Sequence, residues 1–279
     1  MDATTGCHNR LEPTAALVME WAKPLYQDGP AAGFYQCLDL SGGQGLLEQC
    51  RQVCPWYGEI ILNRKFCITE RIIAAALSVQ EPCTVIIPAA GKSPMSLVLL
   101  DRCGDSIDNI REIDLHSMEE KQRIYKKAAS GPARKIHCIT GDITAPDFSL
   151  VPHDRKPLIV VLEGISYYLT RPALEHLLST LPLGERRSRV IIEYLIPAGS
   201  ISPAMRRFPE EVFGLIGEIW GGSTCSRYSP ADIAALARSL GGEVTGEYSL
   251  HDMETARTGR NQYFRQDSDG WIGVSEIQF

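Results

Sequence analysis

Small residues follow the first strong strand signal of the chain, at a place where a nucleotide-like ligand could approach the backbone. The run VIIPAAGKSP (85–94) ends a β-branched apolar stretch and leads into a helical pattern. Ala89, Ala90 and Gly91 leave room beside the main chain, and ligands of doubly wound folds bind at this carboxyl end of the strands. The run is not GxGxxG, so an ordinary strand-to-helix turn with one glycine remains the alternative.

Acidic residues lie at or directly after the ends of the next two predicted strands. Glu112 and Asp114 lie 21 and 23 residues after Gly91, the spacing at which nucleotide-binding α/β folds place a carboxylate that accepts the ribose hydroxyls. A solvated acid at a strand end is the alternative. Asp142, in GDIT (141–144), could accept from the exocyclic amine of adenine or could form an ordinary Asp turn.

A fourth polar group ends the strand pattern PLIVVLE (157–163). Glu163 stands at the carboxyl end of what reads as a central strand, where a carboxylate is costly unless it has a partner. A ligand ammonium or a ribose would supply that partner. The adjacent Tyr167 and Tyr168 could line the same site or could pack in the core. The joint placement of these features indicates a nucleotide-like ligand, with its adenosyl end favoured.

Alternating strand and helix patterns must position these groups. Short apolar runs indicate strands buried on both faces of a parallel sheet, and helical patterns between them indicate βαβ units. The predicted strands are 83–88, 109–114, 135–140, 157–163, 189–196, 242–250 and 273–279. The predicted helices are 11–23, 45–53, 69–77, 94–102, 117–129, 172–180, 210–220 and 230–240. The glycine-rich stretch 28–45 is typical of loops.

Composition excludes several partners. The chain of 279 residues has a formal net charge of −6, with 44% hydrophobic and 22% charged residues, which is typical of a globular protein with a sizeable core. Mild acidity argues against nucleic acid and anionic membranes, since both favour a basic surface. No apolar run reaches the roughly 18 residues of a membrane helix. The N-terminus lacks the basic-then-apolar order of a signal peptide, so we expect a cytoplasmic protein.

The nine cysteines and six histidines give no metal signal. They form no CxxC pair, no zinc-type spacing and no HExxH. We therefore expect reduced, mostly buried thiols and no structural metal.

From Arg64 to about Phe264 the chain resembles the leucine carboxyl methyltransferase family, which includes bacterial O-methyltransferases of secondary metabolism. Four ordered motifs carry the resemblance: REIDLHSMEEKQRIY (111–125), GDIT (141–144), PLIVVLEGISYYLTRPALEHLL (157–178) and HDMETARTGR (251–260). The resemblance implies an α/β fold of the class I Rossmann-like methyltransferase type, with a seven-stranded, mostly parallel sheet and a helical cap. The strand and helix patterns divide the chain into a helical cap at 1–80, which carries no strong strand signal, and a core at 81–279, with a lid insertion at about 197–228.

The resemblance also implies S-adenosylmethionine as the cofactor and a role for each matching residue. Arg64 would pair with the methionine carboxylate, although the adjacent Lys65 could be the true partner. Asp114 would hold the ribose with Glu112 beside it, and Glu163 would lie near the methionyl end. The implied cofactor-binding residues are Arg64, Ala89, Gly91, Glu112, Asp114, Asp142, Ile143 and Glu163.

The first turn departs from the family pattern G-A-G-x-D-T-R. Ala89 replaces the first glycine, Ser93 the aspartate and Met95 the arginine. These departures place the chain in a divergent branch and leave the methyl acceptor open. They also keep a repurposed, non-methylating adenosylmethionine-binding protein as an alternative. An NAD-type dehydrogenase is a further alternative, although it would require GxGxxG at this turn.

No histidine clearly belongs to the site. A hydroxyl acceptor needs a general base, whereas a carboxylate is ionised at neutral pH and does not. We therefore expect O-methylation of a carboxylate on a small molecule or secondary-metabolite intermediate. The sequence does not indicate whether the protein is a monomer or a homodimer.

Two additions to the core are expected to select the acceptor. The N-terminal region 1–62 and the segment 197–228 are rich in aromatics, and aromatics beside arginines suit an apolar acid. We expect both segments to cover the carboxyl edge of the sheet. The residues predicted to border the acceptor are Tyr167, Tyr168, Arg206 and Arg207. Hydrophobic packing of the aromatics, with solvated arginines, is the alternative.

Overall fold

The computed structural model describes residues 9–145, 156–184, 187–220 and 225–279. Its centre is a seven-stranded sheet in the order β5-β4-β3-β6-β7-β9-β8. The strands are β3 (Cys83–Pro88), β4 (Ile107–Asp114), β5 (Ile136–Thr140), β6 (Leu158–Leu162), β7 (Arg189–Leu195), β8 (Glu243–Ser249) and β9 (Ile272–Gln278). Each coincides with a predicted strand, with ends that differ by two residues at most, so the predicted seven strands are confirmed.

Five strands run parallel, and the last one breaks the pattern. The ladders β5-β4, β4-β3, β3-β6 and β6-β7 are parallel. Strand β9 pairs antiparallel with both β7 and β8, between which it lies. The carboxyl ends of the parallel strands therefore meet at one edge of the sheet, which is called the carboxyl edge below.

The apolar runs are continuous because the sheet is covered on both faces. Along β6, Ile159 and Val161 pack in one hydrophobic cluster, whereas Leu158, Val160 and Leu162 pack in the other. This follows from the period of two along a strand. Helices α4 (Tyr57–Ser78), α5 (Met95–Cys103), α6 (Met118–Ala128) and α10 (Leu250–Thr258) contribute to the first cluster, and α7 (Arg171–Ser179) and α9 (Pro230–Ser239) to the second.

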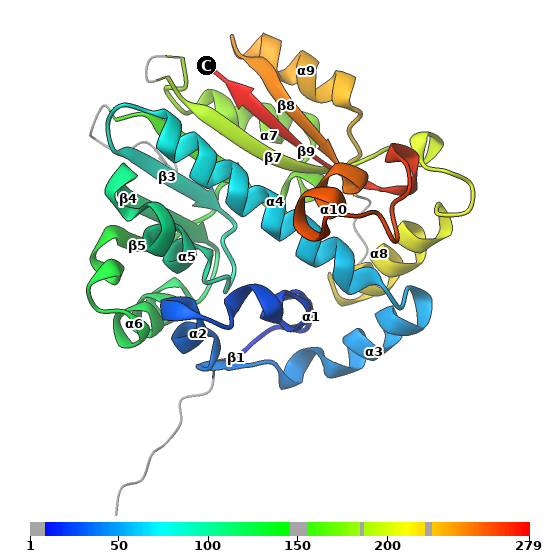
Figure 1. The fold of residues 1–279 in the computed structure, drawn as a ribbon, viewed down its shortest axis with the longest axis horizontal. Helices are drawn as coiled ribbons and strands as arrows, with labels where there is room; N and C mark the ends of the chain where they lie inside the picture. Colours follow the sequence, from blue (N-terminus) through cyan, green and yellow to red (C-terminus); the bar gives the residue numbers. More distant parts are fainter. Residues whose placement is uncertain (1–8, 146–155, 185–186, 221–224) are drawn as a thin grey trace, which may run out of the picture.

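The N-terminal region differs most from the prediction. Helices α1 (Pro13–Ala22) and α3 (Gln44–Val53) were expected, but α2 (Gly29–Tyr35) lies in the stretch 28–45 that was predicted as loops. Helix α4 begins at Tyr57, twelve residues before its predicted start at 69. The short strands β1 (Asn9–Arg10) and β2 (Leu38–Asp39) pair with each other. In Figure 1, α4 crosses the face of the sheet, whereas α1, α2 and α3 lie together below it.

Each of the two added segments has a contact with a residue at the carboxyl edge, and the prediction that they cover the whole edge stays a prediction. From the first segment, Tyr26 in η1 (Lys23–Tyr26) lies with its hydroxyl 3.1 Å from the Ser93 hydroxyl of the turn after β3. From the second, Phe213 in α8 (Arg207–Trp220) packs on Tyr167, which follows β6. Among the described residues, no helix is both long and apolar enough to span a bilayer.

Candidate functional site

The turn after β3 has a left-handed backbone at two positions, one of which carries a side chain. Ala89 has a φ of +54° and Gly91 a φ of +52°. The left-handed conformation costs a residue with a side chain roughly 1–2 kcal/mol, so Ala89 adopts at some strain a backbone conformation that glycine adopts freely. A Cβ built on Gly91 would meet nothing within 4 Å. The turn is therefore open beside Gly91.

Main-chain and carboxylate contacts connect the ends of three neighbouring strands. The Ala90 N–H donates to the Ile113 carbonyl at 3.0 Å, and the Gly91 N–H donates to Oδ2 of Asp114 at 2.8 Å. The Gly141 N–H donates to the Asp114 carbonyl at 3.0 Å. Asp114 thus joins the turns after β3, β4 and β5, at the position where the sequence placed a ribose-binding acid.

Asp114 is half-buried and retains acceptor capacity. Its second oxygen, Oδ1, accepts from the Leu115 N–H at 2.8 Å. A carboxylate offers about four lone-pair sites, so the two N–H donors leave room for ligand hydroxyls. The next side chain, Leu115, is 52% exposed. Leu115 was not among the predicted site residues, although an apolar residue directly after the acid was a signal that could have found it.

Glu112 lies in a different environment from Asp114. Its carboxylate is 1% exposed and accepts from the Ser96 hydroxyl at 2.6 Å and the Tyr125 hydroxyl at 2.8 Å. It also lies 2.8 Å from Nζ of Lys121, which is fully buried. Burial, and then the nearby Glu112, raise the pKa of Tyr125 well above its usual value. These four residues are called the inner network.

The inner network supports the first turn from within the protein. Lys121 Nζ donates to the Ala90 carbonyl at 3.3 Å, and the Tyr125 hydroxyl, whose single proton faces both acceptors, also lies 3.1 Å from the Ser93 carbonyl. Glu112 was predicted to contact the ligand beside Asp114. The structure instead surrounds its carboxylate with protein donors, because α5 and α6 pack over this part of β4.

Asp142 forms the Asp turn that was the alternative for GDIT. Its Oδ1 accepts from the Thr144 N–H at 2.8 Å and from the Thr144 hydroxyl at 2.6 Å. These hydrogen bonds, the hydroxyl's first, hold the pKa of Asp142 below its usual value. Asp142 is exposed and Ile143 is half-buried. Both residues follow β5, next to the end of β4, so they lie close to Asp114. Their predicted contact with the adenine stays a prediction.

Two consecutive residues of α4 bring positive charge to the carboxyl edge. Arg64 Nη1 lies 2.6 Å and 2.5 Å from the two oxygens of Glu193 on β7. Glu193 also accepts from the Gly164 N–H at 2.9 Å. Arg64 and Glu193 are buried, and burial, opposed by Arg64, raises the pKa of Glu193. The sequence analysis did not anticipate this ion pair.

The neighbouring ion pair joins Lys65 to Glu163. Lys65 Nζ lies 2.6 Å from Oε1 of Glu163 and 3.5 Å from the Ser93 hydroxyl of the first turn. The side chains of Lys65 and Glu163 are 3% and 10% exposed. Burial opposes the charge of Glu163, but Lys65 and then Arg64 outweigh it and hold the pKa of its carboxyl below its usual value. The partner that Glu163 required is thus present within the chain.

The predicted acceptor residues fall into two groups. Tyr167 is buried and packs against Tyr168 and Phe213, with ring centroids 4.8 Å and 5.6 Å away. Arg206 is exposed and donates to the carbonyls of Ile201 and Gly199. The tyrosines therefore lie beside the ion pairs of α4, whereas Arg206 binds its own loop.

The aromatics of the two added segments pack on one another and on aromatics of the core. The Trp56 ring lies 5.3 Å from Phe208 and 5.7 Å from Trp271. The Arg207 guanidinium, on an exposed residue, lies 4.9 Å from the Phe208 ring. This arrangement matches the alternative of hydrophobic packing with solvated arginines. Among these residues, the charged side chains form no set of buried ion pairs like that of Arg64 and Lys65.

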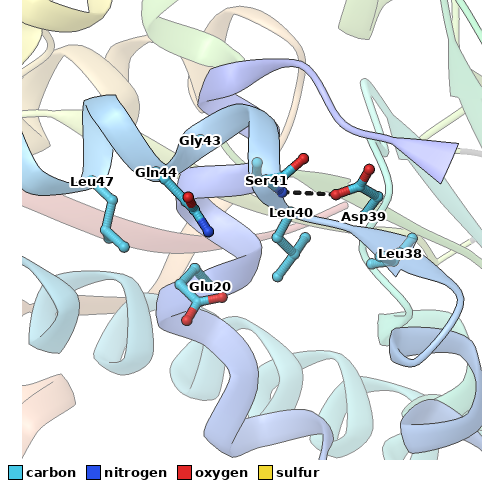
Figure 2. A pocket seen from close by; sticks show the side chains of 9 residues that line it. Glu20, Leu38, Asp39, Leu40, Ser41, Gly43, Gln44 and Leu47 are labelled. Atoms are coloured by element: carbon cyan, nitrogen blue, oxygen red, sulfur yellow. Dashed lines mark hydrogen bonds between the residues drawn. The ribbon is translucent and has the colours of Figure 1, made fainter. Parts of the chain in front are cut away.

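A separate cavity of about 690 Å³ lies in the N-terminal region. It is formed between α1, β2 and α3, and Figure 2 shows Glu20 and Gln44 facing it beside several leucines. Its lining residues are Ala16, Glu20, Leu38, Asp39, Leu40, Ser41, Gly43, Gln44 and Leu47. None of them belongs to the turns that follow the parallel strands. This cavity was not predicted from the sequence.

Comparison with known proteins identifies the fold. No family model matches the chain, and no curated protein matches it. A candidate methyltransferase from Thermobifida fusca is similar in structure, with a TM-score of 0.64, 12% identity, and coverage of 96% of this chain and 95% of that one. A DUF574 family protein from Streptomyces avermitilis has a TM-score of 0.65, 11% identity, and coverage of 96% and 97%.

A third structure is named for its cofactor dependence. It is an S-adenosylmethionine-dependent methyltransferase from Mesorhizobium loti, with a TM-score of 0.51, 10% identity, and coverage of 76% of this chain and 98% of that one. Identities this low establish the fold and nothing finer. The chain has the class I methyltransferase fold, with its seven-stranded, mostly parallel sheet and antiparallel last strand.

Proposed function

We propose that this chain is an S-adenosylmethionine-dependent methyltransferase that acts on a small molecule. One observation carries the proposal: on a methyltransferase fold, Asp114 ends β4 with its carboxylate 2.8 Å from the Gly91 N–H of the first turn. A ribose acid beside an open strand-to-helix turn is the arrangement that binds adenosyl groups in doubly wound folds.

The residues at the carboxyl edge fit such a cofactor. Gly91 is open to the outside of the turn, and Asp114 has spare lone pairs for ribose hydroxyls. Leu115, exposed directly after the acid, offers an apolar surface for an adenine ring. Arg64 Nε is buried without a hydrogen-bond partner among the described residues. Buried donors are normally satisfied, so this atom points to an acceptor that a ligand would supply.

A carboxylate acceptor fits the chemistry of the nearby groups. Bound adenosylmethionine supplies an activated methyl group, so the protein must mainly align the acceptor and exclude water. Burial raises the pKa of Tyr168 to about 12 and that of Tyr167 well above its usual value. Neither tyrosine is a ready base, and an ionised carboxylate requires none.

The resemblance to the leucine carboxyl methyltransferase family supports the finer parts of the proposal, which are O-methylation and a role in secondary metabolism. The division into a cap (1–80) and a core (81–279) with a lid at about 197–228 is supported by the helical patterns that precede the first core strand and by the contacts of η1 and α8 at the carboxyl edge. The acceptor in this proposal is a small carboxylic acid.

One observation favours a second candidate. The strained Ala89, at a φ of +54° where the family has glycine, fits a homologue that binds adenosylmethionine without transferring its methyl group. An NAD-type dehydrogenase fits less well, because β9 is inserted antiparallel between β7 and β8, unlike the strand order of dinucleotide-binding folds.

A transfer assay tests the proposal. The full chain is incubated with methyl-labelled adenosylmethionine and a panel of small carboxylic acids, alcohols and amines. We expect label to appear in at least one carboxylic acid as a base-labile ester. Binding of S-adenosylhomocysteine without transfer to any acceptor would favour the non-methylating homologue, and binding of NAD alone would contradict both.

A further inference from the structure

The cavity of the N-terminal region has the size and lining of a small-molecule site. Its volume of about 690 Å³ lies within the roughly 300–1,000 Å³ of ligand pockets, which combine mostly apolar walls with a few polar groups. Four of its lining residues are buried and two are exposed: Ala16, Leu38, Gly43 and Leu47, and then Ser41 and Gln44. The cavity therefore opens to solvent on one side and ends against packed residues on the other.

Close main-chain contacts fix the walls of this cavity. A Cβ on Gly43 would lie 2.7 Å from the Ala16 Cβ and 2.9 Å from the Leu17 nitrogen, so glycine lets η2 (Ser41–Gly43) approach α1 this closely. Strand β2 is held by its pairing with β1 and by the Leu11 N–H, which donates to the Asp39 carbonyl at 2.9 Å. The cavity is therefore a built part of the fold.

Glu20 brings a negative charge to the cavity from α1. Figure 2 shows the Glu20 carboxylate and the Gln44 amide facing each other across the cavity. Glu20 is half-buried, and none of the described residues gives its carboxylate a hydrogen bond or an ion pair. Burial, and then the charge of Glu20, raise the pKa of Tyr35 to about 12. A partly buried carboxylate without a countercharge is costly, so its position points to a cation from outside the chain.

The other lining residues add apolar surface and a second negative charge. Leu38, Leu40 and Leu47 supply the apolar walls. The side chain of Asp39 is held in place because its Oδ1 accepts from the Ser41 N–H at 2.9 Å. None of the described lining residues is a lysine, arginine or histidine. Two carboxylates without a lining cation make the interior of the cavity electronegative.

We propose that this cavity binds an organic ammonium ion with an apolar body, and that Glu20 is its counter-ion. The leucines pack on the apolar body, and the ammonium, which has three donors, meets Glu20 and the amide oxygen of Gln44. An anion is repelled by both carboxylates, and an uncharged ligand leaves Glu20 without a countercharge. The cavity lies apart from the turns that follow the parallel strands, so the proposal holds whether or not the chain transfers methyl groups.

Titration calorimetry of the full chain with two pairs of probes tests the proposal. Tryptamine and tryptophol share an indole ring, hexylamine and 1-hexanol share an alkyl chain, and only the amine of each pair is charged at neutral pH. We expect at least one amine to bind about ten- to hundredfold more tightly than its alcohol, the gain of one charge-assisted contact. If neither amine binds more tightly than its alcohol, the proposal is overturned.

Variants assign the effect to the cavity. Glu20→Gln keeps the shape of the side chain and should lower the affinity for the amine to that for its alcohol, while the affinity for the alcohol stays the same. Glu48→Gln removes the same charge from an exposed residue of α3 that does not line the cavity, and it should change neither affinity. Unchanged amine binding by Glu20→Gln, or an equal loss in both variants, would overturn the proposal.

Amide exchange locates the bound amine on the native chain without any substitution. The amine should slow hydrogen–deuterium exchange at 38–47, and its alcohol at the same concentration should not. Should Glu20→Gln fail to fold, this contrast decides alone. Protection by the amine elsewhere in the chain, with 38–47 unaffected, would show that the ammonium binds at another place and would overturn the proposal.

Discussion

Glu112 and Asp114 lie two residues apart on β4 and therefore share a face of the strand, yet their surroundings differ sharply. Glu112 is enclosed by Ser96, Lys121 and Tyr125, which all direct a donor or a positive charge at it. Asp114 ends the strand and meets two main-chain N–H groups, one of them from Gly91. Two residues along the same strand therefore separate an acid enclosed by protein groups from an acid at the carboxyl edge.

The difference teaches which of two similar acids has capacity for a ligand. A buried carboxylate surrounded by protein donors stabilises what lies around it, and here that is the first turn, through Lys121 and Tyr125. A carboxylate at the sheet edge is placed by the protein but can still accept from outside. The spacing from Gly91 cannot separate these two roles, because Glu112 and Asp114 both lie at a distance in the sequence that suits a ribose-binding acid.

The largest expected effect is on folding. Glu112→Ala would leave Lys121 fully buried without its countercharge, so we expect a loss of about 3–5 kcal/mol in the free energy of unfolding. Asp114→Ala is the matched control and should cost less than about 1 kcal/mol, because Asp114 is half-buried and its partners can turn to water. Urea unfolding of both variants measures the contrast. Equal losses would remove the distinction between the two acids.

The effect on ligand binding is expected to be smaller than the effect on folding and to fall on Asp114, the acid that contributes less to stability. Asp114→Ala should weaken S-adenosylhomocysteine by roughly 1.5–3 kcal/mol, since it removes a charge-assisted acceptor. Titration calorimetry at a temperature well below the unfolding transition gives this value. Asp108→Ala, at a half-buried acid of the same strand paired with Lys156, serves as the control and should bind normally. Normal binding by Asp114→Ala would show that the ribose acid is misassigned.

The smallest effect concerns the first turn itself. Ala89→Gly should stabilise the chain by up to about 1 kcal/mol, because glycine adopts a positive φ without strain but gains entropy in the unfolded chain. Gly91→Ala should destabilise it by about 1 kcal/mol for the same reason, although space for a Cβ is available there. Thermal unfolding measures both shifts. Shifts of the same sign would mean that backbone strain does not govern this turn.

The turns after β3, β4 and β5 could be located from the sequence because each follows a short apolar run that is easily recognised. β3 to β7 are apolar runs that end in turns, and parallel strands bring those turns together. Gly91, Asp114 and Asp142 could therefore be placed on one edge from their positions in the sequence alone. Their predicted contacts with a ligand stay predictions.

The missed features depend on partners that are distant in the sequence. The first half of α4 carries Asn63, Arg64 and Lys65, all buried, which obscures any amphipathic pattern. The charge of Lys65 is balanced by Glu163 and that of Arg64 by Glu193, roughly 100 and 130 residues later in the chain. Glu112 was assigned to the ligand for the same reason, since Lys121 and Tyr125 lie on a helix whose packing over β4 no local pattern reveals.

Hydrogen–deuterium exchange with and without S-adenosylhomocysteine tests the central claim, the location of the cofactor site, most directly. The account predicts slower exchange of backbone amides at 89–93, 113–116 and 141–144, the three turns that Asp114 connects. Residues 38–47, which line the cavity of the N-terminal region, serve as the internal control. The ligand is not expected to bind there, so the amide exchange of these residues should stay the same. Protection confined to 38–47, with the three turns unaffected, would contradict the account.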